Sequence, residues 1–163
     1  MAEESLITPE IRAMIGQEVM FRAPEEVCKS SIRRFAVAVG DVNPLYVDEK
    51  YAKKSRHKGL IAPPVYLTAV NHDALAEIGD DGRLKSRIKL PPPLNRLARG
   101  GNEFEFFQPA RPGDSLTIKR KITDIFQKEG KSGPLVFVIY ETSYSNQKDE
   151  LLAVNRETLI FFK

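Results

Sequence analysis

One long apolar segment constrains the fold of this chain more than any other feature. It begins after Pro63-Pro64, and a proline is tolerated there because the N–H group that it lacks would have no partner in the first turn of a helix. From Val65 to Ile78, apolar residues occur on most sides of the expected helix. A helix of that kind is buried, so we expect a sheet to cover it.

The C-terminal half carries the strand patterns that such a sheet needs. Residues 102–108 alternate, with Phe104 and Phe106 on one face. Further strands are expected over residues 116–123, 135–144 and 151–162. Between the helix and these strands, Gly82–Arg99 contains three consecutive prolines and predicts an extended crossing loop. Helices followed by consecutive antiparallel strands indicate an α+β domain.

Shorter elements are expected before the apolar segment. Thr8-Pro9-Glu10 supplies a cap, a proline and an acidic first turn, which predicts a short helix. Pro24 limits any strand in residues 18–27 to a short or edge strand. Ser30 or Ser31 is expected to cap a second helix that Gly40 ends. Its apolar stripe comprises Ile32, Phe35, Ala36 and Val39.

The length and composition favour one cytoplasmic domain over residues 1–163. A chain of 163 residues can bury a core of its own, and no run approaches the roughly 20 apolar residues that span a bilayer. The N-terminus has no basic-then-apolar signal pattern. The single cysteine, Cys28, cannot form an internal disulfide, which agrees with a reducing compartment. Too few His, Cys and carboxylate residues occur at ligand spacing to suggest a metal site.

The charge pattern argues against a nucleic-acid binder. The net charge is only +3, and most basic residues are scattered. Two small groups are exceptions: Lys53, Lys54, Arg56, His57 and Lys58, and the pair Arg96 and Arg99. Groups of this size suit a small anionic ligand better than a polymer, although solvated loops are the simpler explanation.

A turn before the apolar segment brings three polar side chains together. Asp41-Val42-Asn43-Pro44 has the composition of a turn, because Asx side chains bond nearby backbone N–H groups. Asp48 is expected to cap one or two helical turns that run through Lys54. Asp41, Asn43 and Tyr46 are therefore candidate site residues, although turn formation and packing would also explain them.

Two stretches carry a resemblance to a known family. They are FAVAVGDVNPLYVDEKYAKKSRHKGLIAPPVYL and GGNEFEFFQPARPGDSLTIKRKI. Together they resemble the MaoC-like hydratases and dehydratases with the hot-dog fold, and most closely the N-terminal-type dehydratase domain. The likeness covers nearly the whole chain. It implies a long central helix wrapped by a curved antiparallel sheet.

The resemblance also implies a reaction. Members of the family add water to a 2-enoyl thioester, or remove it from a 3-hydroxyacyl thioester, of coenzyme A or acyl carrier protein. No other cofactor is implied. Their D-x-N-P-x-H motif activates the water through its Asp and His, and a backbone N–H at the start of the central helix stabilises the thioester oxygen.

This chain matches that motif only in part. Asp41, Asn43 and Pro44 are present, but Tyr46 stands where the family has its histidine. A phenol with a pKa near ~10 is a poor base at neutral pH, whereas imidazole titrates close to neutrality. At the helix start, Pro64 aligns with a family glycine that donates its N–H, and proline has none.

The candidate residues follow from this alignment. The candidate catalytic residues are Asp41, Asn43 and Tyr46, and the candidate substrate-binding residues are Ala62, Pro63, Pro64, Val65, Gly100, Gly101, Arg96 and Arg99. Family branches with such a degenerate site pair with a second hot-dog subunit that has the intact Asp and His. The leading hypothesis is therefore a hydratase or dehydratase subunit, in a homodimer or in a heterodimer with a second MaoC-like subunit.

Other functions stay open at this stage. The chain could be a stand-alone hydratase that uses Asp41 with Tyr46, or a non-catalytic module that binds acyl thioesters. A thioesterase would need a carboxylate on the central helix, where Asp73 and Glu77 are the candidates. The sequence does not identify the acyl group or its carrier.

Overall fold

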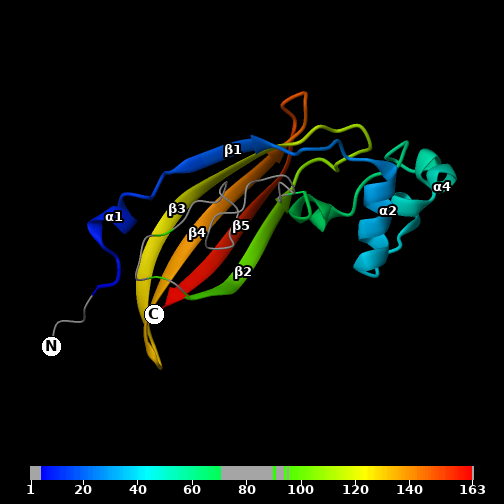
Figure 1. Cartoon of the computed structure of the whole chain (residues 1–163). Coiled ribbons are helices and arrows are strands. Elements are labelled where there is room, and N and C mark those ends of the chain that lie inside the picture. Colours follow the sequence, from blue (N-terminus) through cyan, green and yellow to red (C-terminus); the bar gives the residue numbers. More distant parts are fainter. Residues whose placement is uncertain (1–4, 71–89, 91–93, 95, 163) are drawn as a thin grey trace.

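The main element of the computed structural model is a curved antiparallel sheet. The structure describes residues 5–70, 90, 94 and 96–162. The strands are β1 (Glu18–Arg22), β2 (Arg96–Phe106), β3 (Thr117–Gly130), β4 (Gly133–Ser145) and β5 (Leu151–Phe162). They lie in the order β1-β3-β4-β5-β2, and all four pairings are antiparallel (Figure 1). The predicted α+β fold with a curved antiparallel sheet is confirmed.

Short helices lie at the two ends of this sheet. They are α1 (Pro9–Arg12), α2 (Lys29–Ala38), α3 (Pro44–Val47), α4 (Glu49–Lys54) and the 3₁₀ helix η1 (Pro64–Thr68). In Figure 1, α2 and α4 lie beyond one end of the strands and α1 lies at the opposite end. Two predicted caps are confirmed. Thr8 accepts from the Ile11 N–H at 3.3 Å, and Asp48 accepts from the Lys50 and Tyr51 N–H groups at 2.8 and 3.0 Å.

The predicted cap of α2 is wrong. Cys28, not Ser30 or Ser31, is the N-cap: its sulfur accepts from the Ser31 N–H at 3.4 Å, and Ser31 Oγ accepts from the Cys28 N–H at 3.2 Å. The serine therefore completes the cap from three residues inside the boundary. Gly40 follows the helix with φ +74°, as expected of a left-handed stop.

The apolar stripe of α2 is shorter than predicted. Ile32 and Ala36 are fully buried and Phe35 packs against them, but Val39 is 51% exposed. Val39 is the C-cap residue, so it lies beyond the last turn that packs against the core.

The apolar segment is described only at its beginning. It starts as η1, and residues 71–78 of the predicted central helix lie outside the described residues. Most of the predicted crossing loop lies outside them too. Within the described part of the chain, no helix is long and apolar enough to cross a membrane.

The end of the predicted crossing loop is wrong, because β2 already begins at Arg96. Gly100 and Gly101 lie inside this strand, at a shift of register against β5. A Cβ atom at Gly100 would lie 3.0 Å from Thr158 Cγ2 and 3.1 Å from Ile160 Cδ1. A side chain at position 100 would therefore make Thr158 and Ile160 shift by a few tenths of an ångström, and glycine allows the close approach of β2 to β5 without that shift.

Strand β3 also extends beyond its predicted end at Thr123, to Gly130. A register shift between Ile122 and Asp124 inserts Thr123 as an extra residue against β4. Such a bulge interrupts the alternation of apolar and polar residues, so the sequence pattern ends where the strand continues.

One face of the sheet, here called the inner face, carries the core. It is defined by Tyr140, Thr142 and Tyr144 on β4 and by Ala153, Asn155 and Glu157 on β5, all of them buried. Tyr144 and Ala153 belong to a core cluster that also contains residues of α2, α3 and η1. This cluster joins the helical end of the molecule to the sheet.

Candidate functional site

Two cavities lie on either side of η1. The smaller, here called the Tyr46 cavity, has a volume of about 300 Å³. Its walls are Leu45, Tyr46, Arg56, His57, Ile61, Ala62, Pro63, Pro64, Leu67 and residues 106–110. The larger, here called the Cys28 cavity, has a volume of about 710 Å³. The Tyr46 cavity contains candidate residues from both predicted motifs, the turn and the helix start.

The turn residues hold Tyr46 in this cavity. Asn43 Oδ1 accepts from the Leu45 N–H at 3.0 Å and so caps α3. Tyr46, in the first turns of that helix, is only 8% exposed. Burial raises the pKa of Tyr46, and the nearby negative charge of Asp41 raises it further. The phenol is therefore protonated at neutral pH, with the Asp41 carboxylate close to it.

The opposite wall offers no free backbone donor between residues 61 and 64. The Ile61 N–H donates to the Leu45 carbonyl at 3.2 Å, and the Ala62 N–H donates to the Ala110 carbonyl at 2.8 Å. Pro63 and Pro64 have no N–H group. This wall therefore cannot supply the oxyanion donor that a hydratase of this type uses. The predicted residue Val65 does not line the cavity and is 43% exposed.

His57 is a wall residue that the sequence did not identify, because its basic neighbours suggested a solvent-facing loop. Its carbonyl accepts from Arg111 Nη1 at 2.8 Å, and its Nε2 accepts from Arg56 Nε at 3.2 Å. Burial lowers the pKa of His57, and the charges of Arg56 and Arg111 lower it further. The ring is therefore neutral at pH 7, and the positive charge at this rim comes from the two arginines.

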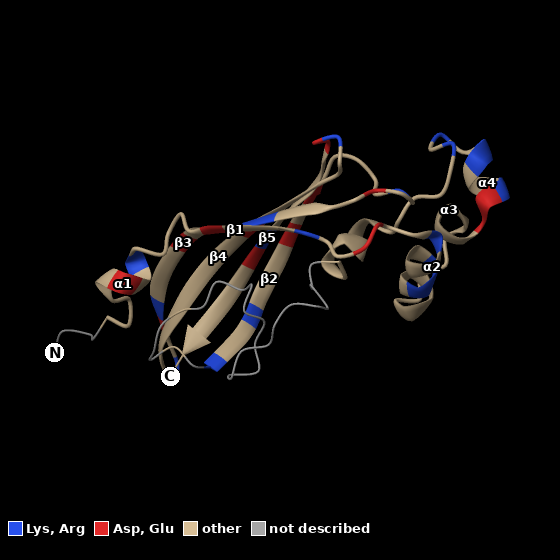
Figure 2. Cartoon of the chain, turned by 45° about the horizontal axis from the view of Figure 1, so that its top comes forward, with Lys and Arg blue, Asp and Glu red and all other residues tan. Residues whose placement is uncertain are grey.

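The helical end as a whole is basic. Residues 29–58 contain eight Lys and Arg against three Asp and Glu. Figure 2 shows these basic residues on α2 and α4. A further hollow of about 280 Å³ there is lined by Lys29, Lys53 and Arg111, together with Glu49. Such a surface attracts anionic ligands.

The four candidate binding residues of β2 lie apart from both cavities. Arg99 pairs with Glu157, with 2.8 Å between Nη2 and Oε1, and the Arg96 guanidinium lies 4.9 Å from the centre of the Phe162 ring. Gly100 and Gly101 lie at the register shift described above. Substrate binding by these four residues stays a prediction.

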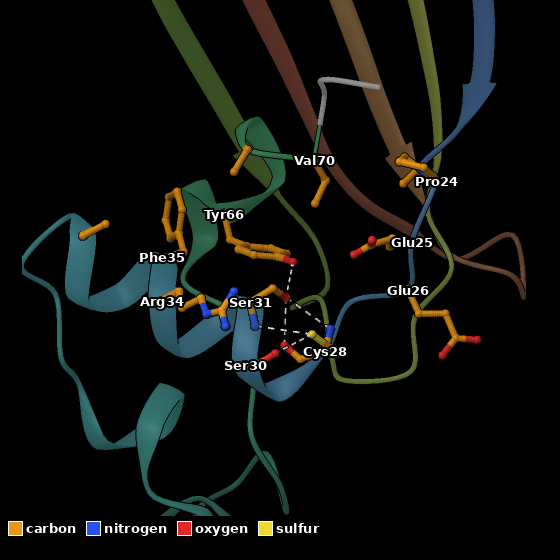
Figure 3. Close-up of a pocket in the computed structure, with 13 residues that line it drawn as sticks. Pro24, Glu25, Glu26, Cys28, Ser30, Ser31, Arg34, Phe35, Tyr66 and Val70 are labelled. Carbon is orange, nitrogen blue, oxygen red and sulfur yellow. Dashed lines mark hydrogen bonds between the residues drawn. The ribbon is translucent and has the colours of Figure 1, made fainter. Parts of the chain in front are cut away.

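The Cys28 cavity lies between α2 and η1 (Figure 3). Ser31 Oγ and Tyr66 Oη are hydrogen-bonded at 2.7 Å, and the Tyr66 ring meets Phe35 edge-on with 5.5 Å between centroids. Arg34, Glu25 and Glu26 add charge to its walls. The sequence did not indicate this cavity. Cys28 lines it as the N-cap of α2, and cysteine is not among the residues preferred at that position.

Cys28 should react readily with thiol reagents. Hydrogen bonds from Ser30 and Ser31 lower the pKa of this thiol to about 7, and the thiolate is the reactive form. Since Cys28 is the one cysteine of the chain, its alkylation rate by iodoacetamide should rise through a midpoint near pH 7. The Ser30→Ala and Ser31→Ala variants should move the midpoint to higher pH. A wild-type midpoint near that of a free cysteine would contradict this assignment.

Among the residues that the structure describes, no group of three or more His, Cys, Asp and Glu could hold a metal ion. The polar groups that meet in the Tyr46 cavity are thus a protonated phenol, a neutral imidazole and two guanidinium groups nearby. They can bind and orient an anionic or carbonyl-bearing ligand.

Comparison with known proteins identifies the family. A family model described as FAS1-like, dehydratase domain region, matches residues 13–155, so the chain belongs to this family. A UPF0336 protein from Streptomyces coelicolor is 33% identical over 73% of this chain and 75% of its own length. A probable enoyl-CoA hydratase alpha subunit from Thermomonospora curvata is 26% identical over 87% of this chain and 47% of its own length.

Solved structures confirm the hot-dog fold. A MaoC-like dehydratase from Rhodospirillum rubrum superposes with a TM-score of 0.67 at 24% identity, covering 91% of this chain and 92% of that one. The ChsH1-ChsH2 complex from Mycobacterium tuberculosis gives 0.72 at 20% identity, covering 94% and 88%. The truncated HadBC complex of the same organism, a (3R)-hydroxyacyl-ACP dehydratase, gives 0.64 at 19% identity, covering 90% and 96%.

Proposed function

We propose that this chain is one subunit of an enoyl-thioester hydratase or 3-hydroxyacyl-thioester dehydratase, and that a second hot-dog subunit supplies the catalytic histidine. The proposal rests on two groups that the Tyr46 cavity lacks: a base that works at neutral pH and a free backbone N–H donor. A protonated phenol occupies the position of the base, and residues 61–64 offer no N–H group for the thioester oxygen. The Asp41 carboxylate lies close enough to Tyr46 to raise its pKa, although Asp41 is not among the residues that line the cavity.

The sheet provides a place for the second subunit. In the described part of the chain, β2 pairs with β5 on one side only, which leaves an 11-residue edge strand exposed along most of its length. Long exposed edges readily pair with another chain. Two similar structures are complexes of two named components, which supports a heterodimer here.

The basic helical end supports an anionic carrier for the acyl group. Of the eight Lys and Arg of residues 29–58, Arg56 lines the Tyr46 cavity itself, and Lys29 and Lys53 line the hollow of about 280 Å³ at the same end of the molecule. Coenzyme A and acyl carrier protein are both anionic. We infer that this surface receives the carrier while the thioester reaches the cavity.

The proposal is tested by assaying hydration of crotonyl-CoA and crotonyl-ACP. The purified chain should show no turnover alone and should gain it when co-purified with a hot-dog protein of the same organism that carries the D-x-N-P-x-H motif. Robust turnover by the chain alone, abolished in Asp41→Ala, would instead establish a stand-alone hydratase. Acyl-CoA binding without turnover in either preparation would establish a binding module.

A further inference from the structure

A group of polar side chains is buried on the inner face of the sheet. Arg120 Nη2 and Glu157 Oε2 form an ion pair at 2.7 Å, with side chains 14% and 8% exposed. The Arg120 guanidinium also lies 4.3 Å from the centre of the Tyr140 ring. The charge of the arginine is therefore matched within the sheet.

Two neutral side chains of the inner face each carry a buried polar atom. Among the residues that the structure describes, Tyr144 Oη and Asn155 Oδ1 are buried and have no hydrogen-bond partner. The residues are 0% and 4% exposed. A buried polar atom without a partner is costly, and native structures rarely keep one unless a water or a ligand bonds to it.

The sheet register relates these residues to the Tyr46 cavity, although neither of them lines it. Phe106, a wall residue of the cavity, lies opposite Ala153, which in turn lies opposite Tyr144. Asn155 is two residues further along β5, on the same face. Neighbouring strands lie about 5 Å apart and two residues of a strand span about 7 Å, so a chain that leaves the cavity along the inner face would cross β5 to approach Tyr144 and follow β5 to approach Asn155.

The two unpartnered atoms would be satisfied by a ligand group that both accepts and donates a hydrogen bond. Burial raises the pKa of Tyr144 to about 12, so its phenol is a hydrogen-bond donor. Asn155 Oδ1 is an acceptor. A hydroxyl group satisfies both, because its oxygen accepts while its hydrogen is donated. A carbonyl would leave Asn155 without a partner, an ammonium could donate to both oxygens but would leave the Tyr144 hydrogen without an acceptor, and a carboxylate would lie close to Glu157.

We propose that the inner face binds a hydroxyl group carried by the acyl chain of the substrate, through Tyr144 Oη and Asn155 Oδ1. This inference rests on the proposed acyl-thioester function. The inference narrows the substrates of that proposed function to acyl thioesters that carry a hydroxyl group on the chain, beyond the positions that react.

The test compares matched saturated acyl-CoA ligands, with and without a terminal hydroxyl group, over a series of chain lengths. Calorimetric titration of the full chain, alone and in its complex, should show one length at which the hydroxylated ligand binds about tenfold more tightly. Tyr144→Phe and Asn155→Leu should each remove this preference, measured as the ratio of the affinities for the hydroxylated and the plain ligand. Tyr51→Phe, at an exposed tyrosine of α4, is the matched control and should keep the preference.

Folding of the variants is checked by thermal unfolding. Tyr144→Phe removes a hydroxyl group that has no partner, so its melting temperature should not fall. Equal affinity for the two ligands at every length, or a preference that survives in both variants, would overturn the proposal and assign the two atoms to a buried water.

Turnover of plain enoyl thioesters by the complex is measured separately. A complex that turns these over without a hydroxyl preference refutes this inference alone, and a hydroxyl preference without turnover refutes the proposed reaction alone.

Discussion

In a complex with the proposed partner subunit, replacing the histidine of that subunit's D-x-N-P-x-H motif with alanine is expected to lower kcat about 100- to 10,000-fold, the usual contribution of a general acid–base group. Tyr46→Phe in this chain should change kcat less than about threefold. The reason is that the pKa of Tyr46 is raised by burial and by Asp41, so its phenol cannot serve as a base at neutral pH. Both values come from steady-state hydration of crotonyl thioesters.

A matched pair of variants separates the two deficits of the Tyr46 cavity. Tyr46→His alone should leave the isolated chain inactive, because residues 61–64 still offer no free N–H group. Adding Pro64→Gly introduces such a donor, and the double variant should gain measurable turnover. A loss of more than about 100-fold in Tyr46→Phe would contradict the whole assignment, since the phenol would then take part in proton transfer.

The sequence predicted best where local chemistry determines local structure. Asp48 and Thr8 cap helices as expected, because an Asx or hydroxyl side chain satisfies the nearest N–H groups regardless of the surrounding fold. The alternation of apolar residues located β4 and β5 within one or two residues. Both signals act over a few residues, so they survive in any tertiary context.

The sequence predicted less well where pairing between distant strands determines structure. Arg96 to Gly101 lacks alternation and contains two glycines, yet it is a strand because β5 pairs with it along its length. The continuation of β3 beyond Ile122 depends likewise on β4. Neither partner can be identified from the pattern of the segment itself.

The same distinction applies to the candidate site. The order Asp41-Val42-Asn43-Pro44 was enough to place a carboxylate near Tyr46, because all of these residues lie in one turn and one short helix. The sequence did not predict that His57 lines the cavity, because the loop of His57 is held by a hydrogen bond from Arg111, which lies in a distant loop, to the His57 carbonyl. The ion pair that engages Arg99 was missed for the same reason: Glu157 reaches it from the adjacent strand β5.

Glu157→Ala is expected to lower the free energy of unfolding by about 3–5 kcal/mol. The substitution leaves the Arg120 guanidinium, 14% exposed, without the carboxylate that lies 2.7 Å from it. Removing one member of a buried ion pair is costly because the remaining charge is poorly hydrated. Arg99 should contribute little to this loss, since its side chain is 67% exposed. Urea unfolding followed by circular dichroism measures the change.

Two controls show whether burial is the cause. Glu141→Ala breaks a pair with Arg156 whose side chains are 38% and 43% exposed, so it should cost less than about 1 kcal/mol. The double variant Arg120→Met with Glu157→Leu removes both buried charges and should be close to wild type, because the apolar side chains fill a similar volume. If Glu157→Ala cost no more than Glu141→Ala, solvent would be reaching the Arg120–Glu157 pair. The inner face would then be wet, and a hydroxyl-bearing chain would gain little by binding there.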